Sequence, residues 1–232
     1  MESRDELTFS DVLASTMHDT KNSLGMLYNT LEGMIGRCQE KRCDVQQEFY
    51  MLQYEIKRLN NILIRLLTLY KAKKNRLLIN LDLHCVSDCL EEAIIQNAPL
   101  LNSRNIEIDL NCPGDLFWVF DYNLVLGVID NIMNNTYRYT RDKVSISAFK
   151  EETFLVIRIE DNGPGYPPQM LRQANSILQN ENPVSFDTGS TGLGLYFSCL
   201  VAKSHKKGEK KGYFLTENGG SLGGGRFSLY IP

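Results

Sequence analysis

An apolar residue recurs at alternating spacings of four and three along one stretch of the chain. The positions are Val45, Phe49, Leu52, Ile56, Leu59, Leu63, Leu66 and Tyr70. Residues with this heptad rhythm form a seam along one side of an α-helix, where partner helices pack. The pattern therefore predicts one long helix that is packed against other helices.

The preceding segment carries the same rhythm, at Leu13, Met17, Leu24, Leu27, Leu31 and Met34, with Thr20 at the skipped position. Ser10 or Asp11 would cap its start. Residues 39–44 are polar and lack a helical pattern, so we expect an antiparallel helical hairpin. Each helix would be about 40 Å long at ~1.5 Å per residue, and two such helices do not enclose a core. We therefore expect the hairpin to dimerise into a four-helix bundle.

The periodicity changes after the basic junction at Lys71 to Arg76. Strand-like segments at 77–83, 106–110, 116–120, 144–148, 154–159 and 226–231 alternate with helical patterns at 86–101, at 121–140 and after Gly192. Such a sequence favours an α+β fold, a sandwich of helices on a mixed sheet. The prediction is two domains, a helical hairpin over 1–74 and an α/β sandwich over 75–232.

Composition restricts the function classes. The 232 residues are 43% hydrophobic, enough for a globular core, and a net charge of −3 provides no cationic field for nucleic acid. The six cysteines form no CxxC pair, which is typical of reduced thiols in a cytosolic protein. The most apolar stretch, Ile62 to Tyr70, is short and contains Arg65, and no signal peptide is recognisable. We expect a cytoplasmic protein with no membrane segment in this chain.

A glycine turn, Asp161-Asn-Gly-Pro-Gly165, follows the β-branched run 154–159, and a second glycine cluster at 192–195 opens a helix. A strand that ends in an acid and turns through glycines lets the backbone approach a ligand closely. Glycines at a helix start leave N–H groups open to phosphates. Ordinary turn chemistry is the alternative for either half alone, whereas the two together favour a nucleotide pocket.

Two asparagines, Asn131 and Asn135, stand four residues apart and share one face of the helix expected at 121–140. An amide oxygen is a suitable ligand for Mg²⁺, whose sites combine a few protein oxygens with phosphates and water. A polar surface stripe that includes Asn134 is the alternative at this point.

Four motifs occur in the order found in one family. Residues 121 and 131–140 resemble an asparagine box, 161–165 and 189–195 resemble two glycine boxes, and 219–227 resemble a terminal glycine signature. Together they resemble the ATP-binding domain of sensor histidine kinases, within the superfamily that includes DNA gyrase, heat-shock chaperone and mismatch-repair ATPases. The resemblance covers about Leu77 to Pro232.

The resemblance implies roles for individual residues. Asp161 would accept a hydrogen bond from the adenine amine, Asn135 would coordinate Mg²⁺, and Asn131 would lie beside the phosphates. Arg138, in place of the family's lysine, would supply positive charge, with Tyr139 beside the adenosine. Residues 166–191 would form a lid. The remaining nucleotide-binding positions would be Gly163, Gly165, Gly192, Leu193 and Gly194.

The segment 17–24 resembles the phosphoacceptor segment of the same kinases. His18 is adjacent to a seam residue and is therefore expected to be exposed, where a neutral imidazole can attack the γ-phosphorus of ATP. Asp19 would orient the imidazole or take up its proton as general base. Asn22, one turn further on the same face, would position water for reverse phosphatase activity. In a chain without an ATP-binding domain, His18 would be interpreted as an ordinary surface histidine.

These features predict a homodimeric, ATP- and Mg²⁺-dependent protein-histidine autokinase that passes phosphate to the receiver domain of a response regulator. One alternative is a non-catalytic phosphotransfer or scaffold protein with a degenerate ATP domain. Another is a serine/threonine kinase or a mechanical ATPase on the same fold. Only about ten residues precede the first helix. The sensor is therefore expected either in a missing domain of a longer kinase or in a separate protein.

Overall fold

The computed structural model describes residues 45–73, 77–179 and 193–232, together with positions 16, 19–20, 22–23, 25–27 and 29–30. The chain divides into two compact units, Leu7–Leu77 and Leu78–Pro232. Each unit is considered by itself below.

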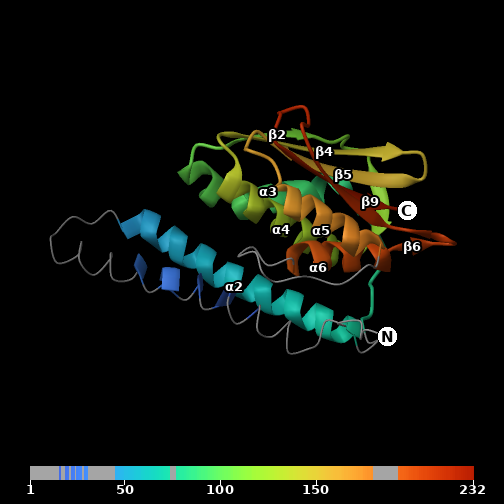
Figure 1. The fold of residues 1–232 in the computed structure, drawn as a ribbon, viewed down its shortest axis with the longest axis horizontal. Helices are drawn as coiled ribbons and strands as arrows, with labels where there is room; N and C mark the ends of the chain where they lie inside the picture. Colours follow the sequence, from blue (N-terminus) through green and yellow to red (C-terminus); the bar gives the residue numbers. More distant parts are fainter. Residues whose placement is uncertain are drawn as a thin grey trace. The chain divides into compact units, whose positions relative to one another are not determined.

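The first unit contains the long helix that the heptad seam predicts. Helix α2 (Val45–Lys73) has 29 residues, and the described positions between 16 and 30 are also helical (Figure 1). Arg58 on α2 donates to the sulfur of Met26 at 3.7 Å and pairs with Glu55 at 3.1 Å. The N-terminal helical segment and α2 therefore touch at this level. The turn expected at 39–44 lies outside the described residues.

The second unit is built on a five-stranded sheet with the order β2-β4-β5-β9-β8. Its strands are β2 (Glu107–Asn111), β4 (Lys143–Glu151), β5 (Phe154–Asp161), β8 (Tyr213–Asn218) and β9 (Gly225–Ile231). The pair β2–β4 is parallel and the other pairs are antiparallel. The sheet is therefore mixed, as predicted.

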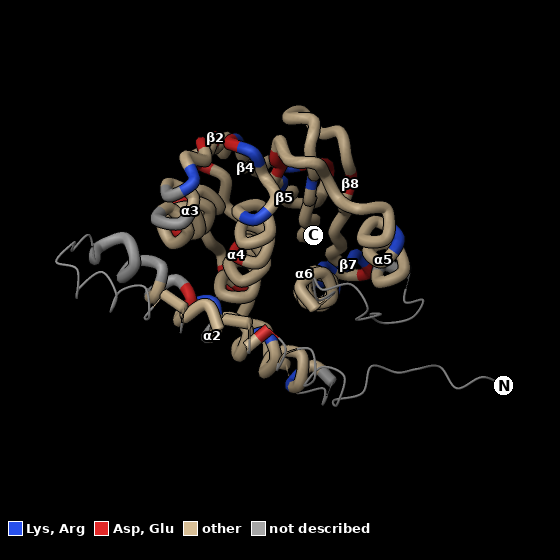
Figure 2. Tube along the Cα trace, turned by 60° about the vertical axis from the view of Figure 1, so that its left-hand side comes forward, with Lys and Arg blue, Asp and Glu red and all other residues tan. Residues whose placement is uncertain are grey.

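Helices cover one face of this sheet (Figure 1). They are α3 (Val86–Ser103), α4 (Tyr122–Tyr139), α5 (Pro168–Gln179) and α6 (Leu193–Ser204). On β4 the buried residues alternate, at Val144, Ile146 and Ala148, because successive strand side chains point to opposite faces. On α4 they recur at helical spacing, as at Val125 and Ile129. These stripes meet in one core. Figure 2 shows basic and acidic residues interspersed along this unit.

Three features differ from the sequence prediction. The strand expected at 77–83 begins only at Asp82, because β1 (Asp82–Cys85) pairs solely with the short β3 (Phe117–Phe120). Leu78 lies before this pairing and is 91% exposed. Helix α5 and strand β8 were not predicted as elements. Neither was the small hairpin of β6 (Lys206–Lys207) and β7 (Lys210–Lys211).

Candidate nucleotide-binding site

The helix that carries the two asparagines is fixed at its start by Asp121. The Oδ1 atom of Asp121 accepts a hydrogen bond from the N–H of Leu124 at 3.0 Å, and this bond caps α4. Its Oδ2 accepts from the N–H of Asn80 at 2.9 Å. The N–H of Asp121 itself donates to Nε2 of the buried His205 at 3.0 Å.

His205 is neutral in this arrangement. Its Nε2 is an acceptor, so Nδ1 carries the proton and donates to the carbonyl of Val201 at 2.7 Å. Burial lowers the pKa of His205, and this effect outweighs the opposing contributions of Val201 and Asp121. The imidazole therefore joins the C-terminal end of α6 to the start of α4.

A pocket of about 250 Å³ lies where the last turns of α4 meet the end of β5 and the loop into α5. It is lined by Asn135, Thr136, Tyr139, Asp161, Pro164, Gly165, Tyr166, Pro167 and Met170. The structure thus brings together four residues that sequence reasoning had selected separately: Asn135, Tyr139, Asp161 and Gly165.

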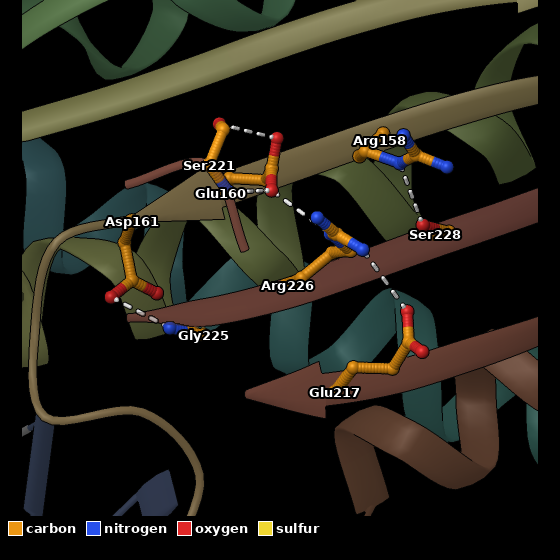
Figure 3. Close-up of polar contacts among 8 residues, drawn as sticks. All are labelled: Arg158, Glu160, Asp161, Glu217, Ser221, Gly225, Arg226 and Ser228. Atoms are coloured by element: carbon orange, nitrogen blue, oxygen red, sulfur yellow. Dashed lines mark hydrogen bonds and ion pairs between the residues drawn. The ribbon is translucent and has the colours of Figure 1, made fainter. Parts of the chain in front are cut away.

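Asp161 presents its carboxylate to this pocket in a fixed orientation. Oδ1 accepts from the N–H of Gly163 at 2.7 Å. It also accepts from the N–H of Gly225 at 3.3 Å (Figure 3). The main-chain oxygen of Asp161 accepts from the N–H of Gly224 at 3.0 Å. Within the described part of the chain, Oδ2 has no hydrogen-bond partner. One carboxylate oxygen is therefore held by backbone donors and the other remains available to a ligand.

The glycines of the turn allow close packing. A Cβ at Gly163 would lie 2.4 Å from the carbonyl oxygen of Tyr139, so the turn rests directly on the C-terminal turn of α4. Gly165 has φ 79°, a left-handed conformation suited to glycine. The loop then continues into Tyr166, whose N–H donates to Asn218 Oδ1 at 2.7 Å and whose carbonyl accepts from Asn218 Nδ2 at 2.9 Å. Burial, assisted by the charge of Asp161, raises the pKa of Tyr166.

Asn162 has a structural role that the sequence did not reveal. Its Oδ1 accepts from Thr140 Oγ1 at 3.0 Å and from the N–H of Lys143 at 3.1 Å. Its Nδ2 donates to Asp142 Oδ1 at 2.6 Å. The side chain therefore holds the turn between α4 and β4 against the glycine turn. The only sequence signal was its place in an Asp-Asn-Gly tripeptide.

The other predicted nucleotide-site residues have different locations. Asn131 is buried on α4, and a Cβ at Gly194 would lie 2.6 Å from its amide atoms, so α6 begins in close contact with α4. Leu193 is buried and Arg138 is exposed. None of these four residues lines the pocket. Gly192, like His18, lies outside the described residues.

Asp19 and Asn22 belong to the first unit and occupy helical positions. Asn22 is exposed and Asp19 is half-buried. Both residues therefore occupy helical positions, as the heptad pattern predicts for the segment around the predicted phosphoacceptor His18.

The donor set of the pocket suits a magnesium–nucleotide complex. Asn135 is half-buried and lines the pocket, and its side chain makes no hydrogen bond with another described residue. No three His, Cys, Asp or Glu side chains among the described residues gather to hold a metal. A cation here would take its other ligands from phosphate oxygens and water, which is the usual coordination of Mg²⁺. Burial raises the pKa of the Cys89 thiol to about 12, which disfavours its thiolate form.

Residues 121–232 match the family described as histidine kinase-, DNA gyrase B- and HSP90-like ATPase. This segment is therefore similar to the ATPase domains that the family model describes. It begins at the N-cap of α4 and contains every residue that lines the pocket.

The chain is also similar to individual relatives and solved structures. The chain is 21% identical over 198 residues to the sensor protein SrrB of Staphylococcus aureus, covering 84% of this chain and 34% of the relative. It therefore spans about a third of that protein's length. The fold is similar to the Acinetobacter baumannii histidine kinase AdeS, with a TM-score of 0.62 and 18% identity over 92% of this chain and 96% of that one.

The catalytic domain of histidine kinase ThkA has a TM-score of 0.54 and 21% identity, covering 66% of this chain and 95% of that domain. The chain thus resembles a histidine kinase catalytic core in its fold. Within the described residues, no helix combines the length and apolar character needed to cross a bilayer.

Proposed function

We propose that the chain is an ATP-dependent protein-histidine autokinase of a two-component system. In this proposal His18 receives the phosphoryl group and passes it to an aspartate of a response regulator. The observation that carries the proposal is the pocket in the ATPase domain, where Asp161 has one carboxylate oxygen available beside Asn135 and the glycine turn. The unit that precedes this domain bears His18 within a heptad-patterned segment.

Three pocket residues have defined tasks in the proposed nucleotide binding. Oδ2 of Asp161 accepts a hydrogen bond from the adenine amine, and Tyr139 lies beside the adenosine. The amide oxygen of Asn135 would be a ligand of Mg²⁺, which would offset the charge that develops on the phosphates. Asn131 and Arg138 do not line the pocket, and in this proposal they act on the phosphates beyond it. The lid at 166–191 and glycines 192 and 194 then enclose the nucleotide.

Autophosphorylation uses residues of the helical unit. A ring nitrogen of neutral His18 forms a bond to the γ-phosphorus as the bond to the bridging oxygen breaks, and ADP leaves. Asp19 takes up or orients the proton on the other ring nitrogen. Asn22 positions water for the reverse phosphatase reaction. The domains proposed for these steps are 1–74 for phosphotransfer and 75–232 for ATP binding.

The helical unit supports the proposed homodimer. Three seam residues of α2, Ile56, Leu63 and Tyr70, are 56%, 55% and 41% exposed. An apolar strip at heptad spacing is the surface that a second copy covers in a four-helix bundle. The sensor that governs the kinase would be in a further domain or a separate protein, since the chain spans only 34% of its relative.

Incubation with radiolabelled ATP and Mg²⁺ tests this function. We expect acid-labile label on the intact chain and none on His18→Gln, while His84→Gln serves as the control. Equal labelling of the intact chain and His18→Gln would refute the assignment of His18 as the phosphorylated residue. Acid-stable phosphoserine would instead favour a serine/threonine kinase.

A second pair of variants tests the metal ligand. Asn135→Ala should abolish labelling by removing the proposed Mg²⁺ ligand, whereas Asn123→Ala, at an exposed position on the same helix, should not. Normal labelling of Asn135→Ala would refute the metal assignment. If the intact chain fails to bind Mg·ATP, the non-catalytic phosphotransfer protein becomes the better description.

A further inference from the structure

Glu160 and Asp161 are consecutive residues at the end of β5 and therefore point to opposite faces of the sheet. Asp161 lines the nucleotide pocket. Glu160 lies on the other face and is only 7% exposed. A buried carboxylate requires compensating partners, so its contacts show what it holds.

The partners of Glu160 come from the glycine turn between β8 and β9 and from β9 itself (Figure 3). Oε1 accepts from the N–H of Ser221 at 2.9 Å and from Nε of Arg226 at 2.9 Å. Oε2 accepts from Ser221 Oγ at 3.0 Å. Burial raises the pKa of Glu160, but the hydrogen bonds from Arg226 and Ser221 outweigh it and leave the pKa below its usual value.

The same glycine turn holds Asp161 at its other end. Gly224 donates its N–H to the main-chain oxygen of Asp161, and Gly225 donates to Oδ1. The turn is closed by hydrogen bonds from Gly219 to Gly224 and from Gly223 to Gly220, each 2.9 Å. A Cβ at Gly220 would lie 2.2 Å from Oε1 of Glu160. The turn therefore bridges two adjacent side chains on opposite faces of the sheet.

We infer that Glu160 is a positioning residue for nucleotide recognition, acting through the 219–225 turn to orient the carboxylate of Asp161. Anchoring Ser221 and Arg226 fixes the two sides of the turn, and the fixed turn presents the Gly224 and Gly225 donors to Asp161. Oδ1 is then occupied and Oδ2 is directed to the base. This inference rests on the proposed function, in which Asp161 reads the adenine amine.

Base discrimination measures this effect directly. Inosine diphosphate carries a carbonyl where ADP carries the amine, so Asp161 should bind ADP more tightly. A hydrogen bond to a charged group corresponds to a preference of roughly ten- to hundredfold. The ratio of the two dissociation constants, measured by calorimetry on the full chain, reports the orientation of Asp161 separately from phosphate binding.

We expect Glu160→Ala to lower the ADP preference about tenfold, with Glu160→Gln retaining part of it because Oε1 can still accept. Glu217→Gln is the matched control, since Glu217 contacts the same Arg226 at 3.6 Å but its side chain is half exposed. It should keep the wild-type ratio. Amide exchange of Gly224 and Gly225 should accelerate in Glu160→Ala and not in the control.

Two outcomes overturn the inference. One is an unchanged ADP preference in a folded Glu160→Ala variant, and the other is an equal loss of affinity for both nucleotides, which marks a general structural role. If Glu160→Ala does not fold, Ser221→Ala provides the test, because it removes one anchoring hydrogen bond and should lower the ratio severalfold. Asp161→Ala distinguishes failure of the Glu160 inference from failure of the proposed function. An unchanged ADP preference in that variant refutes the assignment of Asp161 to adenine recognition.

Discussion

Replacing Gly163 by alanine tests how closely the glycine turn must approach helix α4. An added Cβ would lie 2.4 Å from Tyr139 O, 3.0 Å from Tyr139 C and 2.9 Å from Asp161 Oδ1. The nearest of these contacts is roughly 1 Å short of ordinary van der Waals separation. Two of the three atoms belong to backbone, so rotation of a flexible side chain cannot relieve the overlap. The turn must move away from α4.

That movement has two measurable effects. Overpacking at a backbone contact should lower the free energy of unfolding by about 2 kcal/mol. It should also break the 2.7 Å hydrogen bond from the Gly163 N–H to Asp161 Oδ1. Loss of a hydrogen bond to a carboxylate corresponds to about 2 kcal/mol, or roughly a thirtyfold weaker affinity for ADP if Asp161 reads the base. Urea denaturation followed by circular dichroism and calorimetric titration with ADP measure these quantities.

Gly127→Ala is the matched control. Its Cβ would lie 3.4 Å from the Phe197 ring, an ordinary contact, and Gly127 is inside α4, where alanine is favoured by about 0.5–1 kcal/mol. It should be neutral or stabilising and should bind ADP normally. If Gly163→Ala behaves like Gly127→Ala in both assays, the close-approach argument is refuted.

Three further predictions concern residues around the site. Because burial lowers the pKa of His205, its contribution to stability should be complete above about pH 6.5 and decline as the pH falls below that value, by at most about 1.4 kcal/mol per pH unit. His205→Gln should flatten this decline in urea titrations at several pH values, and an equally steep decline would contradict the assignment. Asn162→Ala should destabilise the domain by about 1–3 kcal/mol, since the 140–143 turn loses its acceptor, whereas Asn111→Ala at an exposed strand position should change stability by less than about 0.5 kcal/mol. Asn218→Ala should weaken ADP binding severalfold by releasing Tyr166, and unchanged affinity in calorimetry would count against that role.

Local patterns predicted the parts of this fold that depend on local periodicity. The alternation at Val144, Ile146 and Ala148 predicted β4, and the heptad rhythm predicted α2. Strand pairing, however, depends on residues that are far apart in the sequence. Leu78 belongs to an apolar segment that looks like a strand, yet it remains outside the sheet because β1 pairs with β3 only from Asp82 onward.

The sequence likewise predicted some residues of the candidate site and not others. Asp161 and Asn135 could be selected from the sequence because a strand-ending acid and a pair of asparagines at helical spacing each have a chemical meaning. The residues that orient them could not. Gly225 is 64 positions from Asp161 and Asn218 is 52 positions from Tyr166, and a glycine-rich turn has no periodicity to show what it contacts. Such partners become visible only when the sheet is assembled.

The hydrogen bonds of Asp121 bear on which piece of the chain can fold independently. Its carboxylate binds the N–H of Asn80, which precedes the family match, and its own N–H binds His205 near the far end of that match. A fragment that begins at residue 121 would lack one of these contacts together with β1, β2, β3 and α3. The segment that matches the ATPase family model is therefore shorter than the segment that supplies the contacts holding helix α4 and its pocket in place.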